Sequence, residues 1–274
     1  MKSASSPFKT NNVSRPLLRW AGSKRRLLPV LRGYAPLSYK RYIEPFCGSI
    51  CLFIDLKPAK GILGDNNKEL IHFYKTLQFR PAQIGKLAAA MPLTDSFYYE
   101  LRSLTPASLS SNDRAARFLY LNRFCFNGVY RTNRSGQFNV PRGKHMGGLP
   151  SVEEITEFGR FIRSAEFHST DFEELIETAT EGDFVYLDPP YAGASRDRGE
   201  YGINAFKEVD IARLTDACLA ASGRGASIVL SYADLPFVRA MLPNWRVHEL
   251  SVLRSVSGFS RGRGNVSELL LSNF

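Results

Sequence analysis

Four consecutive residues, Asp188 to Tyr191 (DPPY), carry groups that could bind and activate a planar amine. They follow the apolar run 184–187, which is short enough to be a buried strand. Because Pro189 and Pro190 cannot continue a strand ladder, the strand must end near Asp188. The Asp188 carboxylate and the Pro189 carbonyl could accept the two N–H bonds of the amine, and Tyr191 could stack on its ring. This set suits group transfer to the amine of a flipped nucleobase. The structural alternative is a proline-rich turn in which Tyr191 only packs.

A second candidate site is the segment EPFCGS, residues 44–49, in which an expected strand ends at a glycine turn. A mononucleotide-like cofactor binds at this position in an open α/β sheet. The segment matches neither GxGxxG nor the P-loop pattern, so dinucleotide and ATP sites lack their motifs. Asp65 ends the next expected strand, 17 residues after Gly48, and could accept from a ribose hydroxyl. The alternative is a tight turn with Asp65 as a helix cap.

Trp20 and Lys24 lie four residues apart in the segment WAGSK. Trp20 could form the wall of a cofactor pocket, and the ammonium group of Lys24 could bind a cofactor carboxylate. S-adenosylmethionine has such an amino-acid end. The alternative is a core tryptophan and a solvated lysine.

The distribution of charge favours a polyanionic partner. The chain has 274 residues and a formal net charge of +10. Ten basic residues and no acidic one lie from Met1 to Ile43, and five basic residues and no acidic one lie from Arg123 to Lys144. A merely solvated basic surface would not separate the signs in this way, so we expect nucleic acid as the partner.

Other residue patterns argue against metal, membrane and secreted classes. The four cysteines form no CxxC pair, the four histidines are scattered, and no further ligands lie near Cys47 and Cys51. We therefore expect free thiols in a reducing compartment and no metal site. No apolar stretch reaches the roughly 18–20 residues of a membrane span. Residues 1–14 lack the apolar centre of a signal peptide.

Alternating strand and helix patterns predict a Rossmann-like, doubly wound α/β fold with a mainly parallel sheet. The expected strands are 41–46, 61–64, 165–168, 183–187, 226–232, 246–253 and 268–273, and the expected helices between them are 50–56, 66–77, 172–178 and 210–221. The chain ends with little helix, which predicts a C-terminal antiparallel hairpin. We expect the last two strands to break the parallel rule.

The stretch 78–150 interrupts this alternation. It has helical periodicity around 97–101 and 115–121, followed by a loop or hairpin rich in Asn, Gly and Arg from 127 to 148. We expect an inserted, mostly helical lobe at 78–150, within a domain formed by 1–77 and 151–274. The residues up to about 13 are expected to form a basic arm.

In combination these segments resemble a Dam-type DNA adenine-N6 methyltransferase of the D12 class, or α-group. The match runs in order through WAGSK, EPFCGS, 64–66 (GDN), 122–131 (NRFCFNGVYR), 138–141 (FNVP) and DPPY. The resemblance implies a catalytic domain at 1–77 and 151–274 that uses S-adenosylmethionine. It also implies that the lobe at 78–150 recognises DNA, with methyl transfer to a flipped adenine and GATC as the candidate target.

Residue by residue, the resemblance implies three sets of functional side chains. The catalytic set is Asp188, Pro189, Pro190 and Tyr191. The cofactor-binding set is Trp20, Lys24, Asp65, Asp171 and Asp188, in which Asp171 resembles the family's contact to the adenine ring. The DNA-binding set is Arg131, Asn133, Asn139 and Pro141.

Two segments depart from the family pattern. The usual glycine-rich turn is Gly48-Ser49-Ile50 here, which predicts a less close approach of the chain to the cofactor, and the hairpin tip 132–137 has a sequence of its own. The alternatives are a DNA cytosine-N4 methyltransferase and a catalytically inactive DNA-binding relative. The Dam-like lobe argues against the first, and the intact Asp188 and Tyr191 argue against the second.

The expected partner is double-stranded DNA. We expect neither a metal nor a membrane as a partner, and we expect a monomer. The expected location is the cytoplasm of a prokaryotic cell or of an infected host cell.

Overall fold

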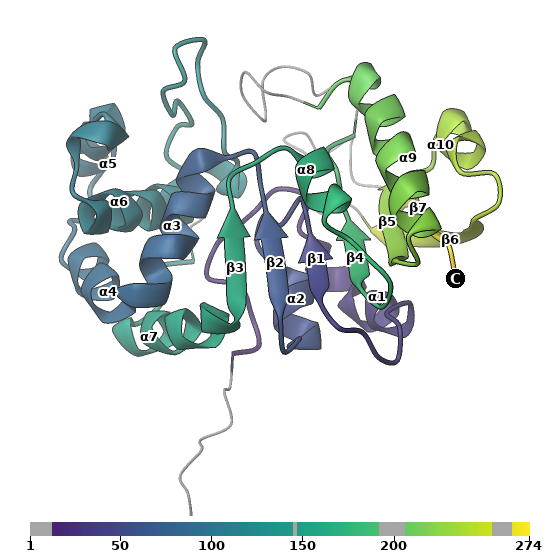
Figure 1. The fold of residues 1–274 in the computed structure, drawn as a ribbon. Helices are drawn as coiled ribbons and strands as arrows, with labels where there is room; N and C mark the ends of the chain where they lie inside the picture. The colour runs from purple at the N-terminus through teal and green to yellow at the C-terminus, as the bar shows by residue number, and fades with distance from the viewer. Residues whose placement is uncertain (1–12, 145–146, 192–205, 254–264) are drawn as a thin grey trace, which may run out of the picture.

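A seven-stranded sheet lies at the centre of the residues that the structure describes (Figure 1). The structure is a computed structural model, and it describes residues 13–144, 147–191, 206–253 and 265–274. The strand order is β3-β2-β1-β4-β5-β7-β6. The strands are β1 (Tyr42–Glu44), β2 (Gly61–Gly64), β3 (Ala165–His168), β4 (Phe184–Leu187), β5 (Ser227–Ala233), β6 (Arg246–Leu253) and β7 (Asn265–Ser272).

The direction of the last strands differs in part from the expectation. Strands β1 to β5 run parallel, and β7 runs antiparallel to both β5 and β6. The mainly parallel sheet and the final antiparallel hairpin are therefore confirmed. The expectation that both last strands break the parallel rule was wrong, because β6 points the same way as β5. Helix α10 (Pro236–Met241) lies between these two strands, and a crossover of this kind joins parallel strands.

Helices cover both faces of the sheet (Figure 1). The elements beside the sheet are η1 (Lys24–Leu27), α1 (Leu28–Gly33), α2 (Cys51–Leu56), α3 (Lys68–Phe79), α8 (Phe172–Glu177), α9 (Glu208–Gly223) and α10. Phe184 and Tyr186 of β4 belong to the hydrophobic cluster that contains α2 and α3. Val185 and Leu187 belong to the cluster that contains α8 and α9. All four are buried, because a central parallel strand is covered on both faces.

A helical block lies beside the β3 edge of the sheet (Figure 1). Its elements are α4 (Pro81–Ala89), α5 (Asp95–Ser103), η2 (Pro106–Ser108), α6 (Ser111–Phe124), η3 (Phe126–Gly128), α7 (Val152–Phe161) and η4 (Ile162–Ser164). Tyr98, Tyr120 and Val140 help to form a small hydrophobic cluster between α5, α6 and the segment after them. Helix α7 lies beyond residue 150 and nevertheless packs against α4. The boundaries at 77 and 150, and the role of the lobe in recognition, stay predictions.

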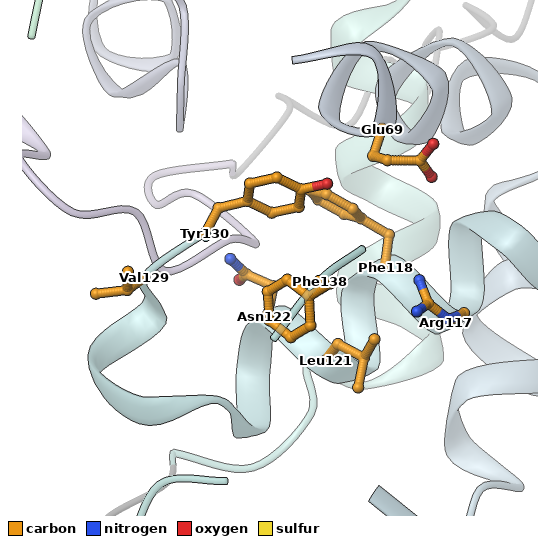
Figure 2. A pocket seen from close by; sticks show the side chains of 8 residues that line it. All are labelled: Glu69, Arg117, Phe118, Leu121, Asn122, Val129, Tyr130 and Phe138. Atoms are coloured by element: carbon orange, nitrogen blue, oxygen red, sulfur yellow. The ribbon is translucent and has the colours of Figure 1, made fainter. Parts of the chain in front are cut away.

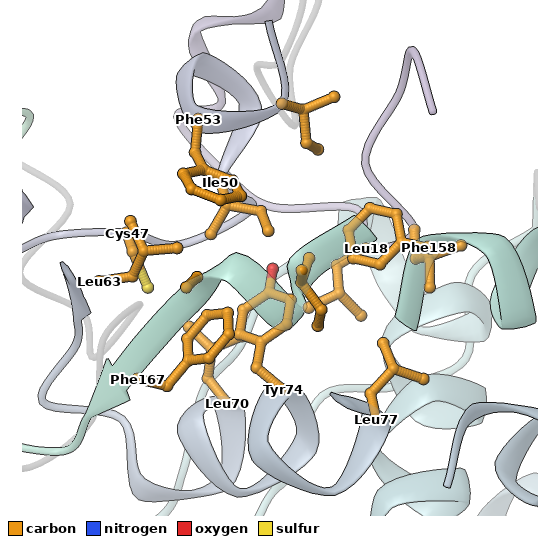
Figure 3. Packing of buried hydrophobic residues seen from close by; sticks show 14 of the residues in the cluster. Leu18, Cys47, Ile50, Phe53, Leu63, Leu70, Tyr74, Leu77, Phe158 and Phe167 are labelled. Atoms are coloured by element: carbon orange, nitrogen blue, oxygen red, sulfur yellow. The ribbon is translucent and has the colours of Figure 1, made fainter. Parts of the chain in front are cut away.

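Tyr74 of α3 supports the glycine turn from the core. Figure 3 shows its ring among apolar side chains from the strands and helices on this face, including Phe167 of β3. The two rings stack with centroids 4.9 Å apart. The buried Tyr74 hydroxyl donates a hydrogen bond to the carbonyl oxygen of Gly48 at 2.8 Å. The turn is therefore fixed by the same core that holds the sheet to α3.

Candidate active site

Three of the predicted site acids follow the ends of parallel strands. Asp65 comes directly after β2, Asp188 directly after β4, and Asp171 three residues after β3. The carboxyl ends of parallel strands meet at one edge of a sheet, so these acids lie on the side where the turn after β1 also opens. This is the edge at which open α/β sheets bind ligands.

Lys24 and Asp188 form an ion pair at this edge. Lys24 Nζ lies 2.9 Å from Asp188 Oδ1 and 3.5 Å from Glu268 Oε2. It also donates a hydrogen bond to the Tyr191 hydroxyl at 3.1 Å, and that hydroxyl donates to Glu268 Oε1 at 2.9 Å. The Lys24 and Glu268 side chains are 7% and 8% exposed and that of Asp188 is 19% exposed, so solvent screens these contacts weakly. We call these four residues the lysine cluster.

The charges of the lysine cluster follow from its burial. Burial raises the pKa of Asp188 to about 6, and the attraction of Lys24 limits the rise. Burial alone would lower the pKa of Lys24, but the neighbouring Asp188, Tyr191 and Glu268 raise it above its usual value. Asp188 is therefore mostly ionised at neutral pH, which is the state that accepts hydrogen bonds from an amine.

The glycine turn after β1 packs against the WAGSK segment. Gly48 has φ of +43°, a region that favours glycine. A Cβ atom at Gly48 would lie 2.8 Å from Cδ1 of Trp20. The Ser49 hydroxyl donates to the Ser23 hydroxyl at 3.2 Å. The WAGSK segment with Trp20 and Lys24 is thus brought beside the turn, and the roles of these two residues in a cofactor pocket stay predictions.

Asp65 joins the turn to the next loop. Its Oδ2 accepts from the backbone N–H of Gly48 at 3.2 Å, and its Oδ1 accepts from that of Asn67 at 2.9 Å. Burial raises the pKa of Asp65 to about 6, and the two backbone donors limit the rise. A carboxylate has about four acceptor positions, so these bonds leave capacity for a ligand hydroxyl. The proposed helix cap is instead Asn67, whose side chain accepts from Glu69 and Leu70.

Ile50 explains how the turn forms without a second glycine. It has φ of +52°, a left-handed conformation that costs a β-branched residue about 1–2 kcal/mol. Its side chain is fully buried near Phe53 in the core (Figure 3). Burying such a side chain contributes about 1.5–3 kcal/mol, which offsets the strain.

Asp171 lies at the start of α8, where its side chain caps the helix by accepting from the backbone N–H of Glu173. It also pairs with Arg213 of α9 at 2.7 Å. Arg213 lies over the ring of Phe172, 4.9 Å from its centroid, and contacts Glu173 and Asp210 as well. Asp171 therefore has a structural role in joining α8 to α9. Its predicted contact to an adenine ring stays a prediction.

The predicted DNA-binding residues lie on a hairpin after α6, which extends beyond the arrowheads of the parallel strands (Figure 1). Bridges pair Thr132 with Phe138 and Cys125 with Arg142. Nε of Arg131 donates to Asn139 Oδ1 at 2.7 Å across the hairpin.

The other two predicted DNA-binding residues, Asn133 and Pro141, lie at the tip and at the base of the hairpin. The Asn133 side chain accepts from the backbone of Ser135 and Gln137 and donates to the Gln137 side chain, so it shapes the tip. Pro141 is exposed, and its carbonyl accepts from the backbone N–H of Phe126.

The base of this hairpin packs firmly on α6. Figure 2 shows Tyr130 and Phe138 of the hairpin beside Phe118 and Leu121 of α6. The cavity that they line has a volume of about 10 Å³. This is the lower limit for a single water molecule, so the cavity is a packing gap.

Helix α6 also holds the segment that carries Trp20 and Lys24. The Asn122 side chain accepts from the backbone N–H of Arg19 at 2.8 Å and donates to its carbonyl at 2.6 Å. Arg123 donates to the carbonyl of Leu17, and Tyr130 stacks on Trp20 with centroids 6.2 Å apart. The phrase NRFCFNGVYR thus connects the hairpin to the candidate cofactor pocket, a role that its sequence alone did not indicate.

A comparison of the sequence with a protein-family model identifies the class of this protein. The model described as D12 class N6 adenine-specific DNA methyltransferase matches residues 20–256. The chain belongs to this family. The prediction of an adenine-specific DNA methyltransferase is confirmed.

Curated relatives of this methyltransferase match nearly its whole length. It is 32% identical over 271 residues to the Type II methyltransferase M1.LlaDCHI of Lactococcus lactis subsp. cremoris, covering 95% of both chains. It is 29% identical over 263 residues to the DNA adenine methylase of Escherichia coli K12, covering 94% of both chains. It is 34% identical over 264 residues to the DNA N-6-adenine-methyltransferase of Escherichia phage P1, covering 93% of this chain and 35% of the phage protein.

Two buried acids near Asp188, Glu268 and Glu44, were not among the site residues that the sequence predicted. Glu268 of β7 belongs to the lysine cluster. Glu44 of β1 accepts from the Tyr42 hydroxyl at 2.9 Å, and burial raises its pKa well above the usual value. The available signal was an acid within an otherwise apolar strand, because acids are rarely buried unless they are paired.

Within 13–144, 147–191, 206–253 and 265–274, no cluster of His, Cys, Asp and Glu is suited to hold a metal ion. Over the same ranges no helix has the length and apolarity needed to cross a membrane.

Proposed function

We propose that this methyltransferase transfers the methyl group of S-adenosylmethionine to the exocyclic amine of a flipped adenine in double-stranded DNA. The observation that carries the proposal is the position of Asp188 and Tyr191. They lie at the carboxyl edge of the sheet, beside the glycine turn and the WAGSK segment. An amine acceptor and a candidate cofactor pocket are therefore neighbours.

The chemistry of the donor set fits this cofactor. Asp65 keeps acceptor capacity for a ribose hydroxyl, and Trp20 offers a partly buried ring beside Gly48. Lys24 and Asp188 supply one positive and one negative group for the charged amino-acid end. Asp171 would contribute the contact near the adenine ring. When bound, S-adenosylmethionine supplies a methyl group on a positively charged sulfur.

The residues after β4 would orient the target amine. Asp188 and the carbonyl of Pro189 accept its two N–H bonds, so that the nitrogen lone pair points away from them. Pro190 keeps the turn rigid, since its φ is fixed near −65°. Tyr191 stacks on the flipped base, a contact worth about 1–3 kcal/mol. Alignment in a preorganised polar site then accounts for much of the rate.

The hairpin would read the DNA. The Asn139 contact uses Nε of Arg131, and the two terminal nitrogens of the guanidinium suffice for a bidentate pair with guanine. Asn139 holds this arginine, Asn133 shapes the tip, and the exposed Pro141 would lie near the groove. GATC is the proposed target, because the Dam-like motifs of the lobe imply it.

A methylation assay tests the proposal. The protein is incubated with labelled S-adenosylmethionine and DNA, and the DNA is digested to nucleosides. We expect N6-methyl-2′-deoxyadenosine from the wild type and none from Asp188→Asn, which should keep its fold. N4-methyl-2′-deoxycytidine would indicate the cytosine enzyme, and no label at all would indicate an inactive relative. Sequencing of the methylated DNA gives the target.

A further inference from the structure

Two carboxylates share one buried ammonium group in the lysine cluster. Lys24 Nζ is 2.9 Å from Asp188 and 3.5 Å from Glu268. Glu268 Oε2 is buried and accepts no hydrogen bond from any described residue. The ammonium group of Lys24 lies closer to Asp188 than to Glu268. A small movement of this group would therefore bring it to Glu268 Oε2.

The proposed chemistry gives such a movement a purpose, since it would free an acceptor position of Asp188 for the target amine. Asp188 must direct acceptor positions at the target amine, and the Lys24 contact occupies one of its oxygens. A buried lysine cannot leave Asp188 for an apolar environment, because an unpaired buried charge is strongly unfavourable. It needs a second anion within reach.

Glu268 also fixes the stacking residue. The Tyr191 hydroxyl donates to Glu268 Oε1 at 2.9 Å, and the Tyr191 ring packs on Tyr232 of β5 with centroids 5.1 Å apart. Glu268 lies opposite Ala233 of β5 and Leu250 of β6, so its backbone is held within the sheet between two strands. The acid therefore has a rigid support and contacts two residues of the proposed site.

We propose that Glu268 is a positioning residue for methyl transfer, which receives the ammonium group of Lys24 when the target amine binds Asp188 and holds Tyr191 for stacking. This inference rests on the proposed roles of Asp188 and Tyr191. It assigns to β7, the one strand that runs against the others in the described sheet, a direct part in preparing the site.

Other ionisable groups also face Asp188 and bear on its pH dependence. They are Lys24 of η1, Glu268 of β7, Tyr191, Tyr186 of β4, Glu44 of β1 and Cys51 of α2. Glu268 raises the pKa of Asp188 and Lys24 lowers it. Removal of the Glu268 charge takes away a repulsion on Asp188 and leaves Lys24 paired with Asp188 alone. Each of these two changes should lower the pKa of Asp188.

The primary test is Glu268→Gln, which keeps a similar shape and removes the charge. We expect kcat to fall about tenfold to a hundredfold, as for the loss of a charged hydrogen bond. The affinities for S-adenosylmethionine and for DNA should change by less than about twofold, because Glu268 is not proposed to contact either of them. The acid limb of the kcat/KM profile should move to lower pH, because that limb reports the acid in the free enzyme.

Two matched variants separate positioning from folding. Glu268→Asp keeps the charge and should recover part of kcat. Glu249→Gln makes the same substitution at an exposed acid of the neighbouring strand β6, and should leave kcat and the pH profile unchanged. An unchanged kcat in Glu268→Gln, or an acid limb that does not move, would overturn the inference.

A double variant tests whether Glu268 acts through Lys24. The kcat loss of Glu268→Gln should become much smaller when Lys24 is already Gln, because the ammonium group is then absent. If the kcat losses of the two single variants simply multiply in the double variant, the inference is contradicted. Asp188→Asn distinguishes this failure from failure of the proposed function, because an active Asp188→Asn variant would refute both, whereas an inactive one leaves the proposed function intact.

Discussion

The side chains after β4 take part in two kinds of contact. Asp188 is the proposed acceptor for the target amine and also the closest partner of Lys24. Tyr191 is the proposed stacking ring, and its hydroxyl lies between Lys24 and Glu268. Substitutions here therefore change both the proposed site and its support, and these effects can be separated by the choice of side chain.

Tyr191 variants should lose activity in a defined order. Tyr191→Ala removes the ring, and with it a stacking contact of about 1–3 kcal/mol, so kcat/KM should fall most. Tyr191→Phe and Tyr191→Trp keep a ring, and they should lose less. Steady-state methylation rates on one oligonucleotide give the order. Equal losses in all three variants would mean that the hydroxyl, rather than the ring, matters.

Asp65 should make stability depend on pH. Its pKa of about 6 in the folded protein lies above its ordinary value of 3.8, so the folded state binds more protons between these values. The wild type should therefore become more stable relative to Asp65→Asn as pH falls from about 7 to about 5. Denaturant unfolding of both proteins at each pH gives the difference. If the free energy of unfolding of the wild type does not rise relative to that of Asp65→Asn as pH falls, Asp65 has no raised pKa.

At the scale of elements, the contacts of α6 link two parts of the molecule. The helix belongs to the helical block and ends at the hairpin, and Asn122 on it holds the backbone of Arg19 from both sides. The WAGSK segment contains no long regular element, so its position depends on such contacts and on the turn after β1. The hairpin and the candidate cofactor pocket thus share a support.

Asn122→Ala should weaken this support. Loss of a partner for a buried backbone group costs about 1–3 kcal/mol, so thermal stability should fall. Affinity for S-adenosylmethionine should fall as well, since Trp20 follows Arg19 directly and Lys24 lies in the same segment. Asn112→Ala, at the start of the same helix, serves as the control and should change neither. Loss of stability with unchanged cofactor affinity, measured by calorimetry, would contradict the link.

At the scale of the whole molecule, the net charge and the hairpin are expected to contribute to DNA binding in different ways. The net charge of +10 provides attraction that does not depend on base sequence. The basic residues Lys2 and Lys9 lie outside the described residues, and Arg15 pairs with Glu154 at the surface. Arg131 instead lies on a hairpin whose shape is fixed by side-chain hydrogen bonds.

Substitutions of Arg131 and of the basic arm should therefore have different effects on DNA binding. Arg131→Ala should reduce discrimination between the target and a one-base-altered site by about 1–3 kcal/mol. Neutralising Lys2, Lys9 and Arg15 should weaken binding to all sequences alike and reduce the salt slope by about 0.9 for each phosphate that the protein no longer neutralises. Methylation of both sites at two salt concentrations separates these outcomes. A uniform loss for Arg131→Ala would identify it as a phosphate-binding residue.

The sequence by itself determined the seven strands, the four helices expected between them at 50–56, 66–77, 172–178 and 210–221, and the family. Apolar runs that stop at Asp65 and at Asp188-Pro189 mark strand ends, because burial patterns and the geometry of proline act locally. The ranges predicted for β2, β3 and β6 match the structure residue for residue.

Only the tertiary structure decided which side chains meet. Lys24 and Tyr191 are 167 residues apart, Tyr191 and Glu268 are 77 apart, and Arg19 and Asn122 are 103 apart. The direction of β6 likewise depended on a crossover through α10. No periodicity encodes such pairs, because a buried acid becomes favourable only when the fold brings a cation and donors to it. The positions of Asp188 and Tyr191 were therefore predictable, but their shared support from Lys24 and Glu268 was not.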